Sequence, residues 1–351
     1  MNIKLNLKVM YFLLLLLSIQ SCKNSDFSLD NVNENTSNAI KTNHHKCATT
    51  QKFLSRRTEN IDYKNKSDLW LSHIRNKPIT EKMIMEDKNS ATKNSSKAYE
   101  IRVVVNHLYQ YSNYKISNKK AKEILAVTED CLNKNNLEYD STPSEFKKKA
   151  GSGNFKLVLE KVKYRKVNKK YWKNTDHVKW WSKGGINATD PKKYMNIWVV
   201  PALENDYSLG EATFPVDYGE WWDGIVIVRN DFIRGENRTL VHEMGHYFGL
   251  FHIWGDDFME DEDDSSVDYC SGTDWVSDTN NQGKMYYGTI SHPQYSCGSK
   301  DMFQNFMGYA DNQTFFTHGQ MLRARQTFWK DWTRPNGMRK SRYPMRAELW
   351  Q

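Results

Sequence analysis

The sequence predicts an α/β (α+β) fold, in which strands and helices alternate up to about residue 249 and an irregular region follows. Residues 101–105 are dense in β-branched side chains and lie between polar runs, which is typical of a buried strand. Residues 118–132 place apolar side chains near helical spacing, so we expect this helix to pack on a sheet. Acidic residues then crowd into positions 256–268, and such blocks usually form solvated loops.

More strands are expected in the middle of the chain. Phe155, Leu157 and Leu159 fall at every second position between less apolar neighbours, which predicts a half-exposed strand. Residues 194–200 and 224–228 are further strands of this kind of sheet, and a helix should follow the second one.

Two helix starts are marked by capping residues. Thr239 can cap the helix after residues 224–228. Its apolar face would consist of Leu240, Met244, Tyr247 and Phe248. Thr317 and Gln320 form a capping-box pattern that opens the last helix. The aromatic residues expected to anchor that helix are Phe328, Trp329 and Trp332.

Residues 242–252 carry the strongest chemical signal, with the sequence HEMGHYFGLFH. On a helix, His242 and His246 lie four residues apart, so both imidazoles leave one face and can reach the same ion. Zinc takes nitrogen ligands at roughly 2.0–2.1 Å and needs a third protein ligand beside an open position. His252 can supply it if Gly249 adopts the left-handed conformation that ends the helix. The alternative is three histidines that only form hydrogen bonds.

The pattern HExxHxxGxxH resembles the zinc signature of the metzincin metalloproteases. Downstream, Asn305-Phe306-Met307-Gly308-Tyr309 resembles the methionine turn of the pappalysin (cytophagalysin) family. Other segments similar to that family are 182–185, 190–191, 194–199, 223–227, 252–256 and 274–279, so the resemblance spans roughly residues 98–335. It implies a metzincin-type catalytic domain over 98–351, with a twisted mixed sheet and the active-site helix in an upper part (98–249) and an irregular lower part (250–351).

This resemblance implies a zinc endopeptidase that hydrolyses extracellular proteins or peptides. One Zn²⁺ would be bound by His242, His246 and His252, and Glu243 would be the general base for the attacking water. Residues 209–215 would be the edge strand on which a substrate aligns as one more strand, with a plain surface strand as the alternative.

Two residues of the methionine turn also receive roles from the resemblance. Tyr309 would donate a hydrogen bond to the developing oxyanion, unless it is a core tyrosine. Met307 would form an apolar floor under the metal. Some relatives prefer Arg or Lys beside the cut through acidic residues beyond this turn, but here only Asp311 is acidic, which does not support that preference.

Calcium is a second metal that the family implies. Oxygen-rich loops bind calcium, and the family places it near Asp274, Asp278 and Thr279 rather than at the acidic run 256–268. Cys270 and Cys297 match cysteine positions of the family, which makes them the expected disulfide in an exported chain. Cys131 lies in a helical stretch and is expected to be a core thiol.

The first 97 residues are expected to be processed. Lys4 and Lys8 precede an apolar run, residues 9–17, that has the length of a signal-peptide core. Residues 19–22 resemble a bacterial lipoprotein processing site with Cys22 as the lipidated residue, and ordinary secretory cleavage is the alternative. We therefore expect a signal peptide over 1–21, a tether and pro-segment over 22–97, and an exported enzyme, either anchored as an outer-membrane or cell-surface lipoprotein or released.

Residues 23–97 are rich in Asn, Lys, Ser and Thr, a composition that cannot bury enough apolar surface to fold alone. Residues 69–71, Leu-Trp-Leu, are the densest apolar cluster, and we expect them to dock on the catalytic domain, with a chance cluster in a mobile tail as the alternative. Cleavage is expected at the basic pair 56–57 or near Lys93 or Lys97. Cys47 resembles the pro-segment cysteine of the family and would place a thiolate on zinc, with a disulfide or an idle thiol as alternatives.

The formal net charge of +8 and the pI near 9.0 raise the question of nucleic-acid binding. The lysines are spread along the chain and no nucleic-acid module is present, so a solvated surface is expected. A second function class is a catalytically silent lipoprotein that binds partners at its surface and uses the metal structurally. The intact Glu243 argues against it.

Overall fold

The computed structural model of the protein describes residues 46–91, 98–173, 175–204, 208–234, 238–255 and 269–327. All of these belong to one compact unit, Asn43–Gln351. Several expectations lie outside the described residues: the leader with Cys22, the basic residues Lys93 and Lys97, the acidic run 256–268, and the aromatic residues Phe328, Trp329 and Trp332. Within the described ranges, no helix is long and apolar enough to cross a membrane.

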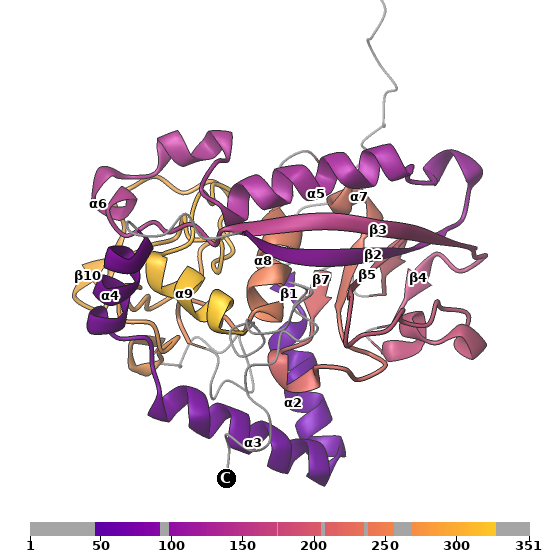
Figure 1. The fold of residues 1–351 in the computed structure, drawn as a ribbon, viewed down its shortest axis with the longest axis horizontal. Coiled ribbons are helices and arrows are strands. Elements are labelled where there is room, and N and C mark those ends of the chain that lie inside the picture. Colours follow the sequence, from indigo (N-terminus) through magenta and orange to yellow (C-terminus); the bar gives the residue numbers. More distant parts are fainter. Residues whose placement is uncertain are drawn as a thin grey trace, which may run out of the picture. The chain divides into compact units, whose positions relative to one another are not determined.

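A six-stranded sheet in the order β1-β7-β8-β5-β2-β3 forms the centre of this unit (Figure 1). Its strands are β1 (Lys46–Cys47), β2 (Tyr99–Tyr109), β3 (Phe155–Lys166), β5 (Met195–Val200), β7 (Ser208–Ala212) and β8 (Ile225–Val228). All neighbours are parallel except β7 and β8, which are antiparallel. This twisted, mostly parallel sheet confirms the predicted fold class.

Helices α5 (Asn118–Leu132) and α8 (Arg238–Tyr247) pack on one face of the sheet, and α5 runs along β3 and β2 in Figure 1. Side chains alternate across a strand, so every second strand residue meets these helices. Ile197 and Ile225 on this face share a core with Leu240 of α8. Trp198 and Val226, one position on, belong to a second core on the opposite face.

The remaining elements of the chain from residue 98 onward, called the catalytic part below, are short. They are α6 (Ser144–Lys147), α7 (Arg229–Phe232), α9 (His318–Gln326), β4 (Tyr171–Trp172), β6 (Ala202–Leu203), β9 (Tyr295–Ser296), β10 (Ser299–Lys300), and the 3₁₀ helices η1 (Ser112–Tyr114), η2 (Leu137–Ser141), η3 (Asp176–Lys179), η4 (Trp181–Lys183), η5 (Pro215–Asp217) and η6 (Tyr269–Ser271). In the described chain after Gly249, only η6, β9, β10 and α9 are regular, in agreement with the irregular lower part expected from the sequence.

The predicted elements are present, and some ends differ. α5 has the predicted limits, whereas β2 and β3 are longer because they pair with each other along their whole lengths. Thr317 and Gln320 form the predicted capping box at the start of α9. The prediction that Thr239 caps the active-site helix is wrong: α8 already includes Arg238, so Thr239 lies within its first turn.

The N-terminal segment contributes β1 and the helices α2 (Thr49–Glu59), α3 (Ile61–Asn76) and α4 (Glu81–Ala91). Trp70 is fully buried, and its ring lies 5.3 Å from Phe214 and 5.7 Å from Phe251, both in the catalytic part. Leu71 is buried in the same cluster, whereas Leu69 is 48% exposed. The predicted docking therefore occurs, through Trp70 and Leu71.

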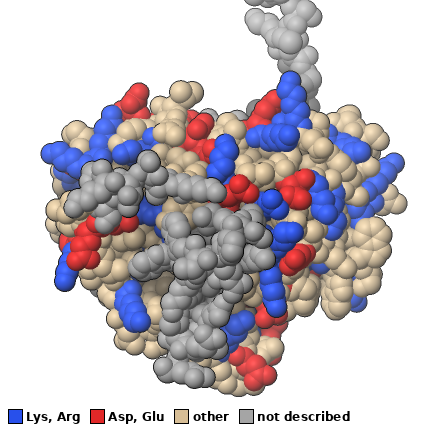
Figure 2. All heavy atoms as spheres, viewed as in Figure 1, with Lys and Arg blue, Asp and Glu red and all other residues tan. Residues whose placement is uncertain are grey.

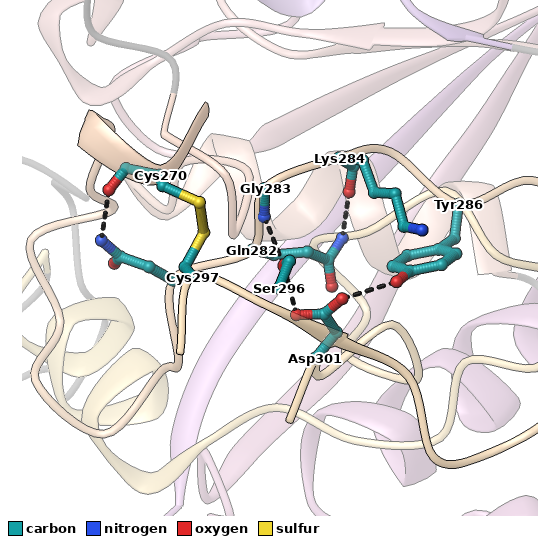
Figure 3. Close-up of a disulfide and its surroundings, with 9 residues drawn as sticks. Cys270, Gln282, Gly283, Lys284, Tyr286, Ser296, Cys297 and Asp301 are labelled. Atoms are coloured by element: carbon teal, nitrogen blue, oxygen red, sulfur yellow. Dashed lines mark hydrogen bonds between the residues drawn. A yellow bond between two sulfur atoms is a disulfide. The ribbon is translucent and has the colours of Figure 1, made fainter. Parts of the chain in front are cut away.

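The lower part contains the disulfide Cys270–Cys297, with Cα atoms 5.2 Å apart, as the resemblance implied (Figure 3). Gly283 lies against both sulfur atoms, where a Cβ would come within 2.9 Å of the nearer one. Its backbone N–H donates to Ser296 Oγ, which in turn donates to Asp301 (2.7 and 2.5 Å). Cys131 is a buried free thiol in α5, as predicted.

Charged side chains are mixed over the surface. In Figure 2, lysines and arginines alternate with acidic residues and form no continuous basic face in this view.

Candidate active site

The active-site helix α8 places its ligand histidines by burying its apolar face. Leu240 and Met244 are fully buried in the main core, which turns His242 and His246 toward β7 and the methionine turn. The helix ends at Gly249, whose φ of +83° is the predicted left-handed conformation. The backbone then returns so that His252, also fully buried, faces the other two histidines.

The Nε2 atoms of His242, His246 and His252 form a triangle with each side 3.2 Å long. Nδ1 of His242 lies 2.7 Å from the Phe306 carbonyl oxygen, and Nδ1 of His246 lies 2.9 Å from that of Leu250. A carbonyl only accepts, so Nδ1 of His242 and of His246 carries the proton, and the Nε2 atoms of these two residues direct lone pairs toward the triangle.

Three ring nitrogens that converge at this distance suit a shared cation. Tetrahedral nitrogen ligands roughly 2.0–2.1 Å from zinc lie about 3.3 Å from one another, close to the observed spacing. The residues present therefore fit the predicted zinc site. The two carbonyl acceptors fix the tautomers of their histidines, as outer partners of metal ligands do.

Aromatic rings hold the histidines from outside the triangle. Trp254 stacks on His252, with ring centroids 4.5 Å apart, and Phe214 meets His246 edge-on at 5.5 Å. Neither ring was assigned a role from the sequence. The position of Trp254, only two residues after His252, could have indicated that its ring contacts this ligand.

The methionine turn lies directly below α8. Met307 is fully buried, and a Cβ at Gly245 would overlap its sulfur atom, so the glycine allows this close approach. Asn305 Oδ1 accepts the Met307 backbone N–H at 2.9 Å, and Asn305 also exchanges two hydrogen bonds with Gln320 of the capping box. The start of α9 therefore fixes the turn.

Tyr309 lies beside the predicted metal ligands, at the margin of the main core. Its ring centroid is 4.9 Å from that of His252 and 5.6 Å from that of His242, and it also contacts Trp254 at 4.8 Å. This position is compatible with the oxyanion role implied by the resemblance.

Glu243 is fully buried and its carboxylate meets the N-terminal segment. Oε2 accepts a hydrogen bond from Thr49 Oγ1 at 2.9 Å and lies 3.5 Å from Cys47 Sγ, while Oε1 has no hydrogen-bond partner among the described residues. Burial raises the pKa of Glu243 to about 8. Burial and the Glu243 carboxylate raise the pKa of Cys47 well above its usual value.

Cys47 joins the three histidines in one cluster. Its sulfur and the three histidine nitrogens lie within 4.8 Å of one another, and all four residues are buried. The Thr49 backbone N–H points to the sulfur at 3.3 Å. Sequence reasoning singled out Cys47 but missed Thr49, which also accepts the Ala212 backbone N–H at 2.7 Å through its hydroxyl and so links the segment to β7.

The residues expected at calcium form a buried loop against the start of α9. Asp274 Oδ1 accepts from the Thr279 hydroxyl (2.6 Å) and the Val276 N–H (3.0 Å), and Asp278 Oδ2 accepts the Gly319 N–H at 2.9 Å. The other oxygen of each carboxylate is buried with no hydrogen-bond partner among the described residues. Burial raises the pKa of Asp274 to about 7.

Comparisons with known proteins agree with this geometry. The peptidase M43 family model, described as Pregnancy-associated plasma protein-A, matches residues 185–328. Mature mirolysin of Tannerella forsythia, solved with a cleaved peptide, is 31% identical, with a TM-score of 0.59 over 73% of this chain and 99% of that one. A promirolysin mutant is 29% identical, with a TM-score of 0.62 over 84% and 95%.

Curated relatives include an extracellular metalloprotease of Arthroderma otae, 31% identical over 39% of this chain and 52% of that protein. Another, from Colletotrichum graminicola, is 30% identical over 38% and 49%. This chain therefore spans about half the length of these curated relatives. The match to mirolysin covers nearly all of that enzyme, and on this ground the chain belongs to the pappalysin family of metalloproteases.

Proposed function

We propose that this chain is the precursor of a zinc-dependent endopeptidase and that its N-terminal segment holds it inactive. The observation that carries this proposal is the cluster of Cys47 with the three histidine nitrogens. A zinc ion bound by His242, His246 and His252 would supply a polarised substrate carbonyl and a more acidic water. A Cys47 thiolate is a good fourth ligand and would exclude that water from the open position.

Glu243 is the general base in this proposal. It lies beside His242 and is not needed as a ligand, so its carboxylate can take the proton of the attacking water and pass it to the leaving amine. In the latent state the Thr49 hydroxyl donates to Oε2. The segment therefore blocks the base as well as the open metal position.

The segment also occupies the strand to which a substrate would pair. The Ala48 N–H donates to the Gly210 carbonyl at 3.1 Å, and Thr49 takes the Ala212 N–H. Without the N-terminal segment, the Ala212 N–H would lose this partner and the Gly210 carbonyl would keep only Ser208 Oγ at 3.1 Å, so both could bind an extended peptide by strand addition. Tyr309 would then donate a hydrogen bond from its hydroxyl to the developing oxyanion.

Residues 98–351 are proposed as the mature enzyme, after loss of a signal peptide over 1–21 and of the tether and pro-segment over 22–97. The solved promirolysin supports a latent precursor in this family, and the extracellular relatives support export and extracellular substrates. A lipid anchor at Cys22 remains part of the proposal.

The test uses the precursor with Glu243→Ala, which should abolish peptide hydrolysis while zinc stays near one ion per chain. Its zinc-edge X-ray absorption spectrum should show one sulfur ligand, and Cys47→Ser in the same background should remove that ligand. A first shell of nitrogen and oxygen alone would contradict the latency. Wild-type turnover by the Glu243→Ala enzyme after processing would contradict the assigned base.

Calcium at Asp274, Asp278 and Thr279 is proposed as a structural ion. Two buried carboxylate oxygens without hydrogen-bond partners among the described residues support it, because an unpaired buried oxygen is costly and calcium binds such oxygens. Adding Ca²⁺ to chelator-treated protein should raise Tm, and Asp278→Asn should remove most of this rise. An unchanged Tm would exclude the site.

A further inference from the structure

A buried cluster of charges lies on the opposite side of β7 from Glu243. Three carboxylates of the catalytic part form it: Asp176 of η3, Glu211 of β7 and Asp217 of η5. Asp217 and Glu211 are almost fully buried, and Asp176 is partly exposed. The only catalytic-part lysine or arginine shown pairing with them among the described residues is Lys179, 3.1 Å from Asp176 and 3.5 Å from Glu211.

Helix α2 of the N-terminal segment brings the other cations. Lys52 Nζ pairs with Glu211 and lies 3.0 Å from Asp176. Arg56, one turn further on, donates to both oxygens of Asp176 at 2.9 and 3.1 Å and lies 3.7 Å from Asp217. Its guanidinium also lies over the Trp222 ring, 5.5 Å from the centroid.

The charges balance only with the segment in place. Three carboxylates face one ammonium of the catalytic part, and Lys52 and Arg56 supply the two missing positive charges. Buried carboxylates need such partners, because desolvation without pairing is strongly unfavourable. The neighbouring cations hold the pKa of Asp176 well below its usual range, although burial alone would raise it. Once the segment leaves, the site has a net charge of about −2 and no longer a full set of partners.

Glu211, a member of this charge cluster, directly follows Gly210 in β7, and Gly210 lies beside the catalytic Glu243. A Cβ at Gly210 would come within 3.0 Å of the Glu243 carboxylate, so that face of β7 borders the metal site. Glu211 points to the other face, because side chains alternate along a strand. A peptide that replaces β1 beside β7 would likewise send alternate side chains toward the metal and toward Glu211.

We propose that Asp176, Glu211 and Asp217 form a specificity subsite for a Lys or Arg side chain of the peptide substrate, which Lys52 and Arg56 fill in the latent protein. This inference rests on the proposed removal of the segment. It differs from recognition through the methionine turn, because Asp311 lies beyond that turn and is exposed. The buried carboxylates and the flat Trp222 ring suit a long cationic side chain.

The test is cleavage of a mixed peptide library by the mature enzyme, with the products sequenced. Lys or Arg should be enriched at one fixed position relative to the cut. Two peptides that differ only there, Lys against Met, should then differ at least tenfold in kcat/KM. Asp176→Asn, a change at the most exposed carboxylate of the three, should remove most of this difference in kcat/KM between the two peptides.

Asp311→Asn is the matched control and should keep the preference for the Lys peptide. Cleavage with no basic preference at any position would overturn the subsite, as would a preference that Asp311→Asn removes and Asp176→Asn does not. Absence of all cleavage by correctly processed wild-type protein would instead contradict the proposed peptidase function. An Asp176→Asn enzyme that still cleaves the Met peptide shows that the variant is folded, so its result with the Lys peptide decides the question.

Discussion

Replacing Trp70 by alanine should release the N-terminal segment from the catalytic part. The Trp70 ring is fully buried and lies within 5.9 Å, between centroids, of Phe53, Phe214 and Phe251. Truncating a buried tryptophan typically costs about 3–5 kcal/mol. Two of its three partners belong to the catalytic part, so we assign most of this loss to docking. Because about 1.4 kcal/mol corresponds to a tenfold change, the released population should rise roughly 100-fold or more.

The measurement is the rate at which a thiol reagent labels Cys47 in the Glu243→Ala precursor, which cannot process itself. Serine at positions 22 and 131 leaves Cys47 as the one free thiol, since Cys270 and Cys297 form a disulfide. Trp70→Ala should raise the labelling rate about 100-fold if opening is rapid and reversible. Leu69→Ala is the matched control: its side chain is 48% exposed, and its rate should stay within about twofold.

An unchanged labelling rate in Trp70→Ala would refute the argument that this ring holds the segment down. Circular dichroism must show that the catalytic part stays folded. Loss of the whole fold would show that the two parts form one cooperative unit, and the release of the segment would then not be separable.

Three further outcomes are expected. Tyr309→Phe in the mature enzyme should lower kcat about tenfold or more with Tm unchanged, and an unaltered kcat would return Tyr309 to a packing role. Gly245→Ala should lower the free energy of unfolding by about 1–3 kcal/mol because the new methyl group overlaps the Met307 sulfur, and Met307→Ala should recover part of this loss in the double variant. Burial lowers the pKa of His107 from 6.5 to about 4, so its contribution to stability, about 3 kcal/mol, is fully present above pH 6.5 and is lost as the pH falls toward 4. His107→Gln should unfold with a shallower dependence on pH in that window, and an equal dependence would exclude His107 as the cause.

The elements that the sequence predicted well are those that local periodicity specifies. The limits of α5 and the capping box of α9 depend on residues close together in the chain, so a single segment contains the information. The start of α8 was misplaced because Thr239 offered a local capping group, although Asn237, also a preferred N-cap residue type, directly precedes Arg238 in the sequence. The lengths of β2 and β3 depend on pairing with each other, which neither segment encodes alone.

The predictions for the active site differ in the same way between residues that are close in the sequence and residues that are distant. His242, His246 and His252 lie within one helix and one turn, and their spacing alone predicted a common ion. Thr49 could not be recognised, because its two hydrogen bonds go to Glu243 and Ala212, more than 160 residues away. The composition of the N-terminal segment indicates only that it cannot fold in isolation. It does not reveal that Trp70 and Leu71 pack against Phe214 and Phe251 of the catalytic part.

The basic pair Arg56-Arg57 shows why this complementarity matters for activation. From the sequence, the pair is a candidate cleavage point, but both residues lie within α2, and Arg56 is held by Asp176 and Asp217. Arg57 donates to Ser67 and Asp68 of α3. A protease needs an extended, accessible chain, so cleavage at this pair requires that α2 first leave the carboxylates and unfold locally. Separation of the segment from the catalytic part would therefore precede cleavage at residues 56–57 and would not result from it.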